Sequence, residues 1–378
     1  MEKKLIALVF IALVGLGGVY VLGFTILYQR ISALQSNVEK LLGAQYTPFV
    51  CLYPCLYPYG YYKNQTPAYK DDFVADLQTA YNMGFKGIRL TTEMYLYDDG
   101  NLAWALDEIG KKDLKAMITF FWFDRSYKRP YPEKAWSKDG FPNNETQTDL
   151  YCEYLTNVTK IVKDKDAMWA YNIIYPFNSS TPEEQTEWLS RIQTSEYKTE
   201  MQRMIDSIRN YDTSHWIYVS LGLWATNPFP LYDKVPYDLD GISGLGFHHY
   251  TTKCNDIDSR MLDSLFEYFD KKGFGLGNRQ KFIFVDEWGI QTNESAEVPI
   301  QATNESNKAR MIQEYIDYFY DKPIVWCYFG LHDYPPENAD FGLIKHPDND
   351  LKLSGLTMKE RLHRDLQRDC PLHIHHIS

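Results

Sequence analysis

Two hydrophobic patterns alternate along the chain from about residue 47. Short apolar runs bounded by turn residues predict buried strands, and stretches with an apolar residue every three or four positions predict amphipathic helices. The predicted strands are residues 48–53, 87–90, 114–121, 168–174, 216–220, 241–247, 281–285 and 324–329. The predicted helices lie around residues 73–83, 102–109, 155–162, 182–209, 262–269, 309–319 and 358–366, with the first two ended by Gly84 and Gly110.

Strands that alternate regularly with helices predict an α/β fold with a parallel sheet. Eight such units favour a closed (β/α)8 TIM barrel over residues 47–378. The alternative is an open doubly wound sheet, which normally carries a Gly-rich phosphate turn after its first strand. Here the first strand runs into Tyr53-Pro-Cys-Leu-Tyr-Pro, which favours the barrel.

The N-terminal segment has the composition of a membrane span. Leu5–Tyr28 contains 24 residues and no charge, and Lys3 and Lys4 precede it. A cleaved signal peptide is the alternative, but no small-x-small cleavage site follows the apolar run. We therefore predict a transmembrane anchor over residues 1–28, with the barrel on the extracellular side of the cell membrane.

Helical spacing of apolar residues continues beyond the anchor. The positions are Phe24, Leu27, Ile31, Leu34, Val38 and Leu41. This heptad-like spacing predicts a membrane-proximal helical stalk over residues 29–46 and a homo-oligomer formed through residues 24–41. The alternative is an amphipathic helix that packs on its own domain.

Several features agree with an extracellular location. Six Asn-x-Ser/Thr sites are candidates for glycosylation: Asn64, Asn144, Asn157, Asn178, Asn293 and Asn304. The cysteine count is six, an even number that permits disulfides outside the cell, although the spacing assigns no pairing.

The charge balance narrows the function classes. The chain has 39 Lys+Arg against 50 Asp+Glu, a net charge of -11, and no basic cluster, which excludes a typical nucleic-acid binder. No Cys-x-x-Cys or Cys/His spacing resembles a zinc site, and the histidines near the C-terminus fit a frayed tail. We expect neither a metal nor a cofactor.

Chemistry in a TIM barrel is expected at the C-terminal ends of the strands. Those positions carry Arg89, Glu93, Trp122, Asp124, His248, Tyr250, Asp286, Glu287, Trp288 and Phe329. Aromatic faces stack on sugar rings and charged groups hold hydroxyls, so this set suits an uncharged, polyhydroxylated ligand.

Five motifs in the same order resemble the cellulase-type barrels of glycoside hydrolase family 5. They are Met-Gly-Phe-Lys-Gly-Ile-Arg-Leu (83–90), Arg-x-x-Asp-x-x-His (209–215), Gly-Phe-His-His-Tyr (246–250), Phe-Val-Asp-Glu-Trp-Gly (284–289) and Phe-Gly-Leu-His-Asp (329–333). The resemblance covers residues 48 to about 360.

The resemblance implies a role for most of these side chains. Glu287 is implied as the nucleophile, with Arg89 as its hydrogen-bond donor. His248 and Tyr250 are implied to line the subsite of the reacting sugar, and Phe329 to stack on a ring. Asp286 is expected to have a structural role. The remaining residues predicted to contact substrate are Trp122, Tyr175 and Trp288.

The second carboxyl group of a retaining hydrolase is missing from its usual place. The family places it after the fourth strand in Asn-Glu-Pro, where this chain has Ile174-Tyr175-Pro. Glu183 or Glu184 on the following segment, or Glu93 or Asp124 on another strand, are the candidate acids. The sequence therefore predicts a retaining endo-β-glycanase of cellulase or mannanase type that acts on polysaccharide. The alternative is a degenerate barrel that binds glycans or serves as a structural surface protein.

Overall fold

The structure is a computed structural model of the 378-residue chain. It describes residues 47–51, 68–93, 100–121, 145–175, 190, 194–221, 238–251, 253–274, 281–292, 301–320, 322, 324–331, 341–345 and 350–368. The predicted anchor (1–28) and stalk (29–46) lie outside these residues. Within the described part of the chain, every helix is too short or too polar to span a membrane.

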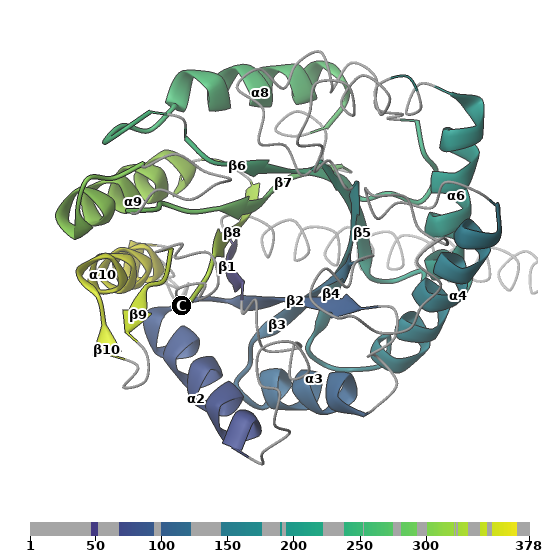
Figure 1. The fold of residues 1–378 in the computed structure, drawn as a ribbon, viewed down its shortest axis with the longest axis horizontal. Coiled ribbons are helices and arrows are strands. Elements are labelled where there is room, and N and C mark those ends of the chain that lie inside the picture. The colour runs from purple at the N-terminus through teal and green to yellow at the C-terminus, as the bar shows by residue number, and fades with distance from the viewer. Residues whose placement is uncertain are drawn as a thin grey trace, which may run out of the picture. The chain divides into compact units, whose positions relative to one another are not determined.

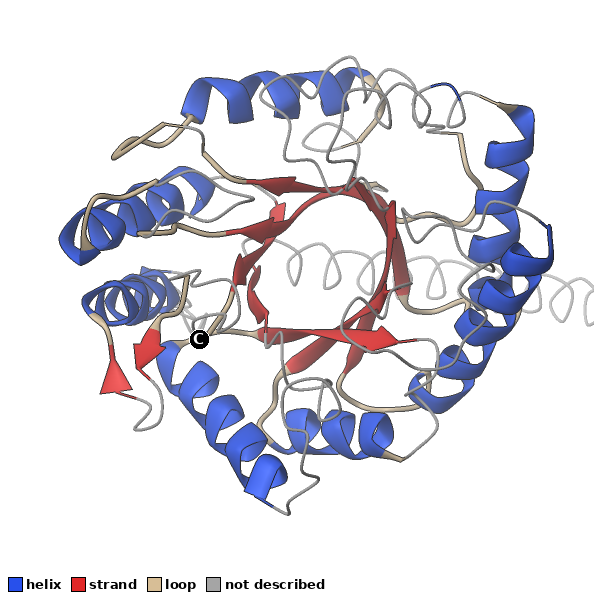
Figure 2. Cartoon of the chain, in the orientation of Figure 1, coloured by secondary structure: helices blue, strands red, loops and turns tan. Residues whose placement is uncertain are grey.

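Eight parallel strands form a closed barrel in chain order, with β1 hydrogen-bonded to both β2 and β8 (Figures 1 and 2). The strands are β1 (Thr47–Cys51), β2 (Gly87–Glu93), β3 (Lys115–Phe121), β4 (Met168–Tyr175), β5 (Trp216–Leu221), β6 (Gly244–His249), β7 (Phe282–Trp288) and β8 (Ile324–Phe329). The predicted closed barrel is therefore the observed fold of the described residues.

Helices surround the strands (Figure 2). They are α2 (Ala68–Met83), α3 (Asn101–Lys111), α4 (Glu145–Val162), α6 (Ser195–Arg209), α8 (Ser259–Lys271), α9 (Glu305–Tyr320) and α10 (Leu353–Arg368). The apolar positions that predicted them are buried against the barrel, as at Leu77 of α2 and Phe269 of α8. This helix–strand layer holds most of the buried apolar side chains.

Several boundaries differ from the predicted ones for local reasons. β6 begins at Gly244 rather than at residue 241, because Gly241 has a positive φ of 80° that a strand does not allow. α3 continues through Gly110 to Lys111. A short hairpin, β9 (Ile344–Lys345) with β10 (Asp350–Leu351), was not predicted from the sequence.

Aromatic side chains fill part of the barrel interior. The rings of Tyr218 on β5 and Phe284 on β7 stack at 4.0 Å with an interplanar angle of 6°. β6 lies between these strands, and a Cβ on its Gly246 would come within 3.0 Å of the Tyr218 ring. Glycine at 246 therefore leaves room for the stacked rings. Closer to the C-terminal ends of the strands, the barrel interior becomes polar.

Candidate active site

β7 continues beyond its predicted end, and its last residues are acidic. The strand ends at Trp288, so Asp286 and Glu287 are among its last three residues and do not belong to the loop that follows. The pairing register shifts at this point, against β6 at Phe247/His248 and against β8 between Val285 and Trp288. Such irregularities re-aim side chains, and here both carboxylates come within 4 Å of one guanidinium.

Glu287 is held by two donors, one on β2 and one directly after β6. Arg89 of β2 donates from Nη1 to Oε2 at 2.8 Å, and the Tyr250 hydroxyl donates to Oε1 at 2.6 Å. Arg89 is 2% exposed and Glu287 7% exposed, so this contact is nearly free of solvent. Two charge-assisted hydrogen bonds fix the carboxylate in one orientation at the end of the barrel.

His248 lies against both carboxylates. Its Nε2 is 3.5 Å from Asp286 Oδ2 and 3.6 Å from Glu287 Oε2. Burial by itself lowers the pKa of His248, but the negative charges of Glu287 and Asp286 outweigh it, so the pKa is raised above its ordinary value.

The carboxyl group of Asp286 is fully buried beside Arg89 and His248. Arg89 Nη2 is 3.9 Å from its Oδ2. Burial by itself raises the pKa of Asp286, but His248 and Arg89, with a contribution from the Ser220 hydroxyl, lower it overall. Asp286 is therefore ionised at neutral pH, and it is a member of the charged cluster in addition to any structural role.

A chain of polar side chains crosses the barrel interior behind Arg89. Arg89 Nε donates to Thr119 Oγ1 at 3.0 Å, and Thr119 donates to Asn172 Oδ1 at 3.1 Å. Asn172 Nδ2 donates to Ser220 Oγ at 2.9 Å. All four residues are buried. Thr119, Asn172 and Ser220 were not predicted as site residues, although a polar residue inside an otherwise apolar strand is a usable signal.

Three aromatic rings pack beside Glu287. Phe341 lies 5.6 Å from Tyr250 and 5.2 Å from Phe329, and Tyr250 and Phe329 are 6.2 Å apart, in edge-to-face arrangements. Gly289 follows the acidic pair, and a Cβ there would lie 2.9 Å from Phe341 Cδ1. Phe341 was missed by the sequence analysis, and its contact explains the need for glycine after Trp288.

Trp288 does not join the site. It is fully buried on the outer side of β7, with its ring 5.0 Å from that of Tyr315 and 5.6 Å from that of Phe319, both on α9. The expectation that Trp288 contacts substrate is thus corrected. Side chains alternate along a strand, and Trp288 follows Glu287 to the opposite face.

The structure does not describe the side chains of the other predicted site residues. Trp122, Asp124, Glu183 and Glu184 lie outside the described residues, and so do the side chains of Glu93 and Tyr175. Among the eight strands of the barrel, the acidic residues are Glu93, Asp286 and Glu287, and β4 has none. The structure therefore describes the surroundings of Glu287, while the source of the proton donor stays a prediction.

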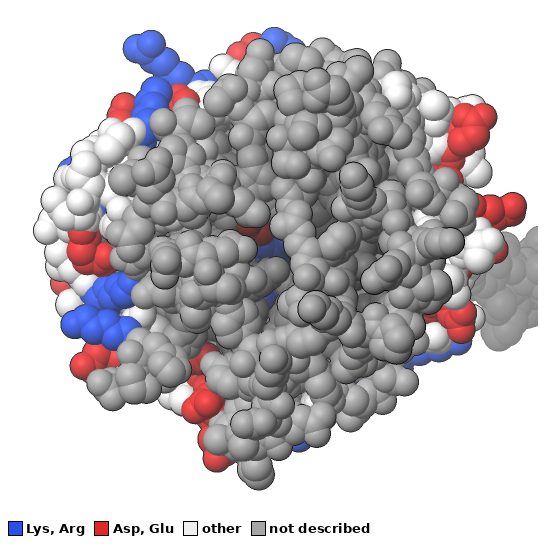
Figure 3. Space-filling model, in the orientation of Figure 1, with Lys and Arg blue, Asp and Glu red and all other residues white. Residues whose placement is uncertain are grey.

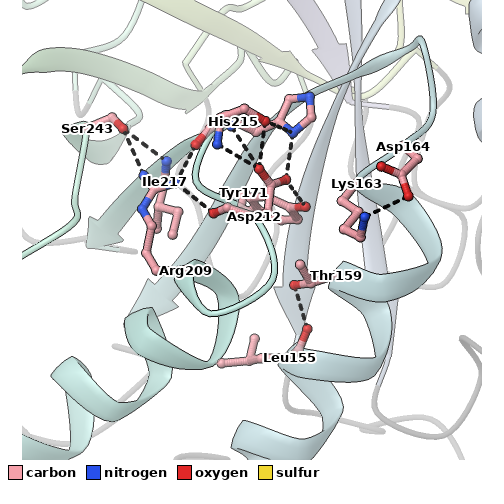
Figure 4. A network of polar contacts seen from close by, with 11 residues as sticks. Leu155, Thr159, Lys163, Asp164, Tyr171, Arg209, Asp212, His215, Ile217 and Ser243 are labelled. Atoms are coloured by element: carbon pink, nitrogen blue, oxygen red, sulfur yellow. Dashed lines mark hydrogen bonds and ion pairs between the residues drawn. The ribbon is translucent and has the colours of Figure 1, made fainter.

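The motif Arg-x-x-Asp-x-x-His builds a second polar network at the opposite end of the barrel (Figure 4). Asp212 precedes β5 and accepts hydrogen bonds from Tyr171 at 2.7 Å and from His215 Nδ1 at 2.6 Å. Arg209 donates to the carbonyls of Asp212 and His215. Residues at the N-terminal ends of barrel strands stabilise the fold, and this network has that role.

Two of the predicted glycosylation sites are described. Asn157 is half-buried on α4, and Asn304 is exposed, where its Oδ1 accepts from the Asn307 N–H at 2.9 Å. The sites at Asn64, Asn144, Asn178 and Asn293 lie outside the described residues. The described residues contain no cluster of three or more His, Cys, Asp or Glu side chains that would hold a metal ion.

The view in Figure 3 shows acidic and basic atoms in a recess near the centre of this face, in the orientation in which Figure 1 looks into the ring of strands.

The comparisons with known proteins agree with the geometry. The profile of the cellulase family (glycosyl hydrolase family 5) matches residues 62–335, well over half of the chain. The comparison with curated proteins gives no match.

Solved structures share the fold at low sequence identity. A Bifidobacterium longum enzyme of glycosyl hydrolase family 5, subfamily 18, solved as a Glu-to-Ala variant in complex with Manβ1-4GlcNAc, has a TM-score of 0.61 and 12% identity over 84% of this chain and 78% of its own. A broad-specificity endoglucanase of the same family from Clostridium longisporum has a TM-score of 0.60 and 16% identity, over 86% of this chain and 97% of its own.

An exo-β-1,4-mannosidase from Opitutaceae bacterium strain TAV5 has a TM-score of 0.59 and 12% identity, over 85% of this chain and 60% of its own. At such identities the structures support the barrel alone. The family profile goes further, because it spans the strands that carry Arg89, His248 and Glu287. The chain belongs to the cellulase family, glycosyl hydrolase family 5.

Proposed function

We propose that the protein is a retaining β-glycoside hydrolase in which Glu287 is the nucleophile. The observation that carries this proposal is the pair of hydrogen bonds that the Glu287 carboxylate accepts, from Arg89 Nη1 at 2.8 Å and from the Tyr250 hydroxyl at 2.6 Å. A nucleophile needs a fixed orientation and a negative charge. The two hydrogen-bond donors hold the carboxylate in one orientation and stabilise its negative charge.

In the proposed mechanism, Glu287 attacks the anomeric carbon and forms a glycosyl–enzyme while the glycosidic bond breaks. Tyr250 and Arg89 then stabilise the carboxylate as it leaves, when water hydrolyses the intermediate. The leaving oxygen needs a proton from a second carboxyl group about 5–5.5 Å from the nucleophile. Glu183 or Glu184 remains the candidate for this donor, with Glu93 or Asp124 as the alternative.

The proposed substrate is an internal β-linkage of a glucan or mannan. Membership of the cellulase family supports a β-linked polysaccharide. Phe329 supports it as well, because the ring packs beside Tyr250 at the end of β8 and suits a sugar face. Endo and exo action are distinguished by the length of the first products released from a long polysaccharide.

An activated aryl glycoside tests the nucleophile without the missing acid. A 2,4-dinitrophenolate leaves without protonation, so 2,4-dinitrophenyl β-glucosides, mannosides and cellobiosides report on Glu287 alone. We expect the full-length chain to release dinitrophenol, and Glu287→Gln to reduce the rate by roughly 10⁴-fold or more. Glu267→Gln is the matched control, because Glu267 is exposed on α8 and its side chain pairs with Lys271.

Release of reducing ends from β-glucan, mannan and xylan then tests the complete reaction. Loss of polysaccharide cleavage in Glu183→Gln or Glu184→Gln, with dinitrophenyl glycoside cleavage retained, would identify the acid. If the parent chain releases neither dinitrophenol nor reducing ends between pH 3 and 8, the enzyme proposal is wrong.

A second candidate function is glycan binding by a barrel without catalysis. The observation that favours it is the fourth strand, whose described residues Met168–Tyr175 contain no acidic side chain. Electrophoresis in gels that contain β-glucan or mannan tests it. Retardation of the parent that Phe329→Ala weakens, without product formation, would support the binding function, and unchanged migration of the parent would contradict it.

We also propose that residues 1–28 anchor the protein in the cell membrane with the barrel outside, and that residues 24–41 associate the chains. The charge-free run Leu5–Tyr28 supports the anchor, and the six sequons support the orientation. Protease treatment of intact cells tests the location: digestion of the barrel without lysis is expected. Crosslinking of full-length chains, with Leu34→Lys as the variant that disrupts the apolar spacing, tests the association.

A further inference from the structure

Four charged groups from three strands meet at the end of the barrel. β2 contributes Arg89, β6 contributes His248, and β7 contributes Asp286 and Glu287. The contacts alternate in sign, since both the guanidinium and the imidazole lie within 4 Å of both carboxylates.

The charges in this cluster balance only when the imidazole is protonated. Arg89 is always charged, so it neutralises one of the two carboxylates. A buried carboxylate without a positive partner is strongly unfavourable. An imidazolium at His248 removes that cost, because the cluster then holds two positive and two negative groups.

The neighbouring histidine provides an internal comparison. His249 is also buried, but it points to the opposite side of β6, where its Nε2 contacts the Tyr315 hydroxyl of α9 at 2.9 Å. Burial lowers the pKa of His249 to about 4. The two adjacent histidines thus experience similar burial, and the difference between them is the pair of carboxylates beside His248.

We propose that Asp286 is a positioning residue, whose buried carboxylate keeps His248 protonated and seated against Glu287. Arg89 already supplies a positive charge for Glu287. The carboxylate of Asp286 adds a second negative charge, which a protonated His248 balances. The imidazolium in turn places positive charge 3.6 Å from Glu287 Oε2, on the side that Arg89 also contacts.

The proposal has a consequence for pH. The groups that face His248 are Arg89 from β2 and Asp286 and Glu287 from β7, while Tyr250 holds the other oxygen of Glu287. Arg89 keeps its charge and the pKa of Asp286 is lowered, so the proton that leaves this cluster as the pH rises above neutral is assigned to His248. Activity is expected to fall on the alkaline side as that proton leaves. This last expectation alone rests on the proposed function.

The protonation of His248 is tested by NMR on the full-length chain, without any substrate. The nine histidines are labelled with ¹³C and ¹⁵N, and His248 and His249 are assigned from His248→Gln and His249→Gln. We expect His248 to titrate above the ordinary value of about 6.5 and His249 well below it. In Asp286→Asn, which keeps the shape and removes the charge, the His248 midpoint is expected to fall by about one pH unit or more.

Asp212→Asn is the matched control, because Asp212 is also a buried aspartate that contacts a histidine, at the opposite end of the barrel. It should leave the His248 titration unchanged. If His248 is neutral at pH 7 in the parent, the proposal is overturned, whether or not Asp286→Asn folds. It is also overturned if His248 titrates alike in the parent and in Asp286→Asn. An inactive parent with the expected titrations would reject the proposed function and leave this inference standing.

Discussion

At the scale of single residues, the contacts of Arg89 restrict which residue type can occupy its position. It is buried, its guanidinium contacts both carboxylates of β7, and its Nε enters the polar chain through Thr119. Few residue types combine a permanent charge with a planar fork of donors, so lysine is a poor replacement.

Arg89→Met is expected to lower the free energy of unfolding by about 3–5 kcal/mol, because it leaves two buried carboxylates without their main cation. Denaturant unfolding at pH 7 measures the change. Arg310→Met is the matched control, since Arg310 pairs with Glu314 on the exposed surface of α9, where the loss should stay within about 1 kcal/mol. Equal effects of the two substitutions would contradict the importance of the Arg89 contacts.

Gly289 and Phe341 form a second pair whose coupling can be measured. Gly289→Ala is expected to destabilise the fold by about 1–3 kcal/mol, because the new Cβ would lie 2.9 Å from Phe341 Cδ1. Phe341→Leu makes room for that methyl group. In a double-mutant cycle, the effect of Gly289→Ala should therefore be smaller in the Phe341→Leu background. Strictly additive unfolding energies would show that the close contact does not set the need for glycine.

At the scale of elements, α10 completes the layer of helices around the barrel. α10 packs between α9 and α2, and its Leu362 contacts Gly84 at the end of α2. Gly84 has a positive φ of 95°, so it both ends α2 and lets α10 approach. The first and last elements of the barrel are joined through this contact as well as through the pairing of β1 with β8.

Leu362→Ala is expected to cost about 2–5 kcal/mol of stability, because Leu362 is 2% exposed and its removal leaves a cavity. Leu356→Ala on the same helix is the control: Leu356 is 48% exposed, and its loss should cost less than about 1 kcal/mol. Thermal unfolding of both variants measures the difference. Equal effects of the two substitutions would contradict the packing of α10 against the barrel through Leu362.

The elements were largely predictable because barrel strands and their helices have different apolar periods. All eight predicted strands overlap with observed strands, and Leu77 or Phe269 could be assigned to the core from spacing alone. The exact end of β7 could not be predicted. The apolar run of this strand ends at Val285, and tertiary pairing with β6 and β8 extends the strand to Trp288.

The site was predictable only in the residues that strand ends and motifs expose. Arg89, His248, Tyr250 and Glu287 are brought together as expected. Trp288 was misplaced, because alternation within a strand puts it opposite to Glu287. Phe341 could not be found from the sequence, since it reaches Tyr250 from a segment beyond β8 through tertiary folding alone.

At the scale of the whole molecule, the two ends of the barrel respond to different ranges of pH. The charged cluster lies at the C-terminal ends of the strands and the Asp212 network at the N-terminal ends. Burial by itself raises the pKa of Asp212, but hydrogen bonds from Tyr171, His215 and Ser214 lower it well below its usual range.

Because the folded-state pKa of Asp212 is depressed, its contribution to stability is present above the unfolded pKa of about 3.9 and is lost as the pH falls through the folded value. Asp212→Asn removes this contribution. The variant should be less stable than the parent at pH 6, and the difference should shrink below pH 4. Unfolding curves measured from pH 2.5 to 7 test this, and a constant difference across the range would contradict it.

The polar chain behind Arg89 also imposes a direction on the protons inside the barrel. A guanidinium has donors and no acceptor, so Thr119 must accept from it and can only pass its own hydrogen onward to Asn172 Oδ1. The amide of Asn172 is thereby oriented with its Nδ2 toward Ser220. Every hydrogen in this row points from β2 toward β5, so one donor-only guanidinium determines the orientation of the Thr119 hydroxyl and of the Asn172 amide across four strands.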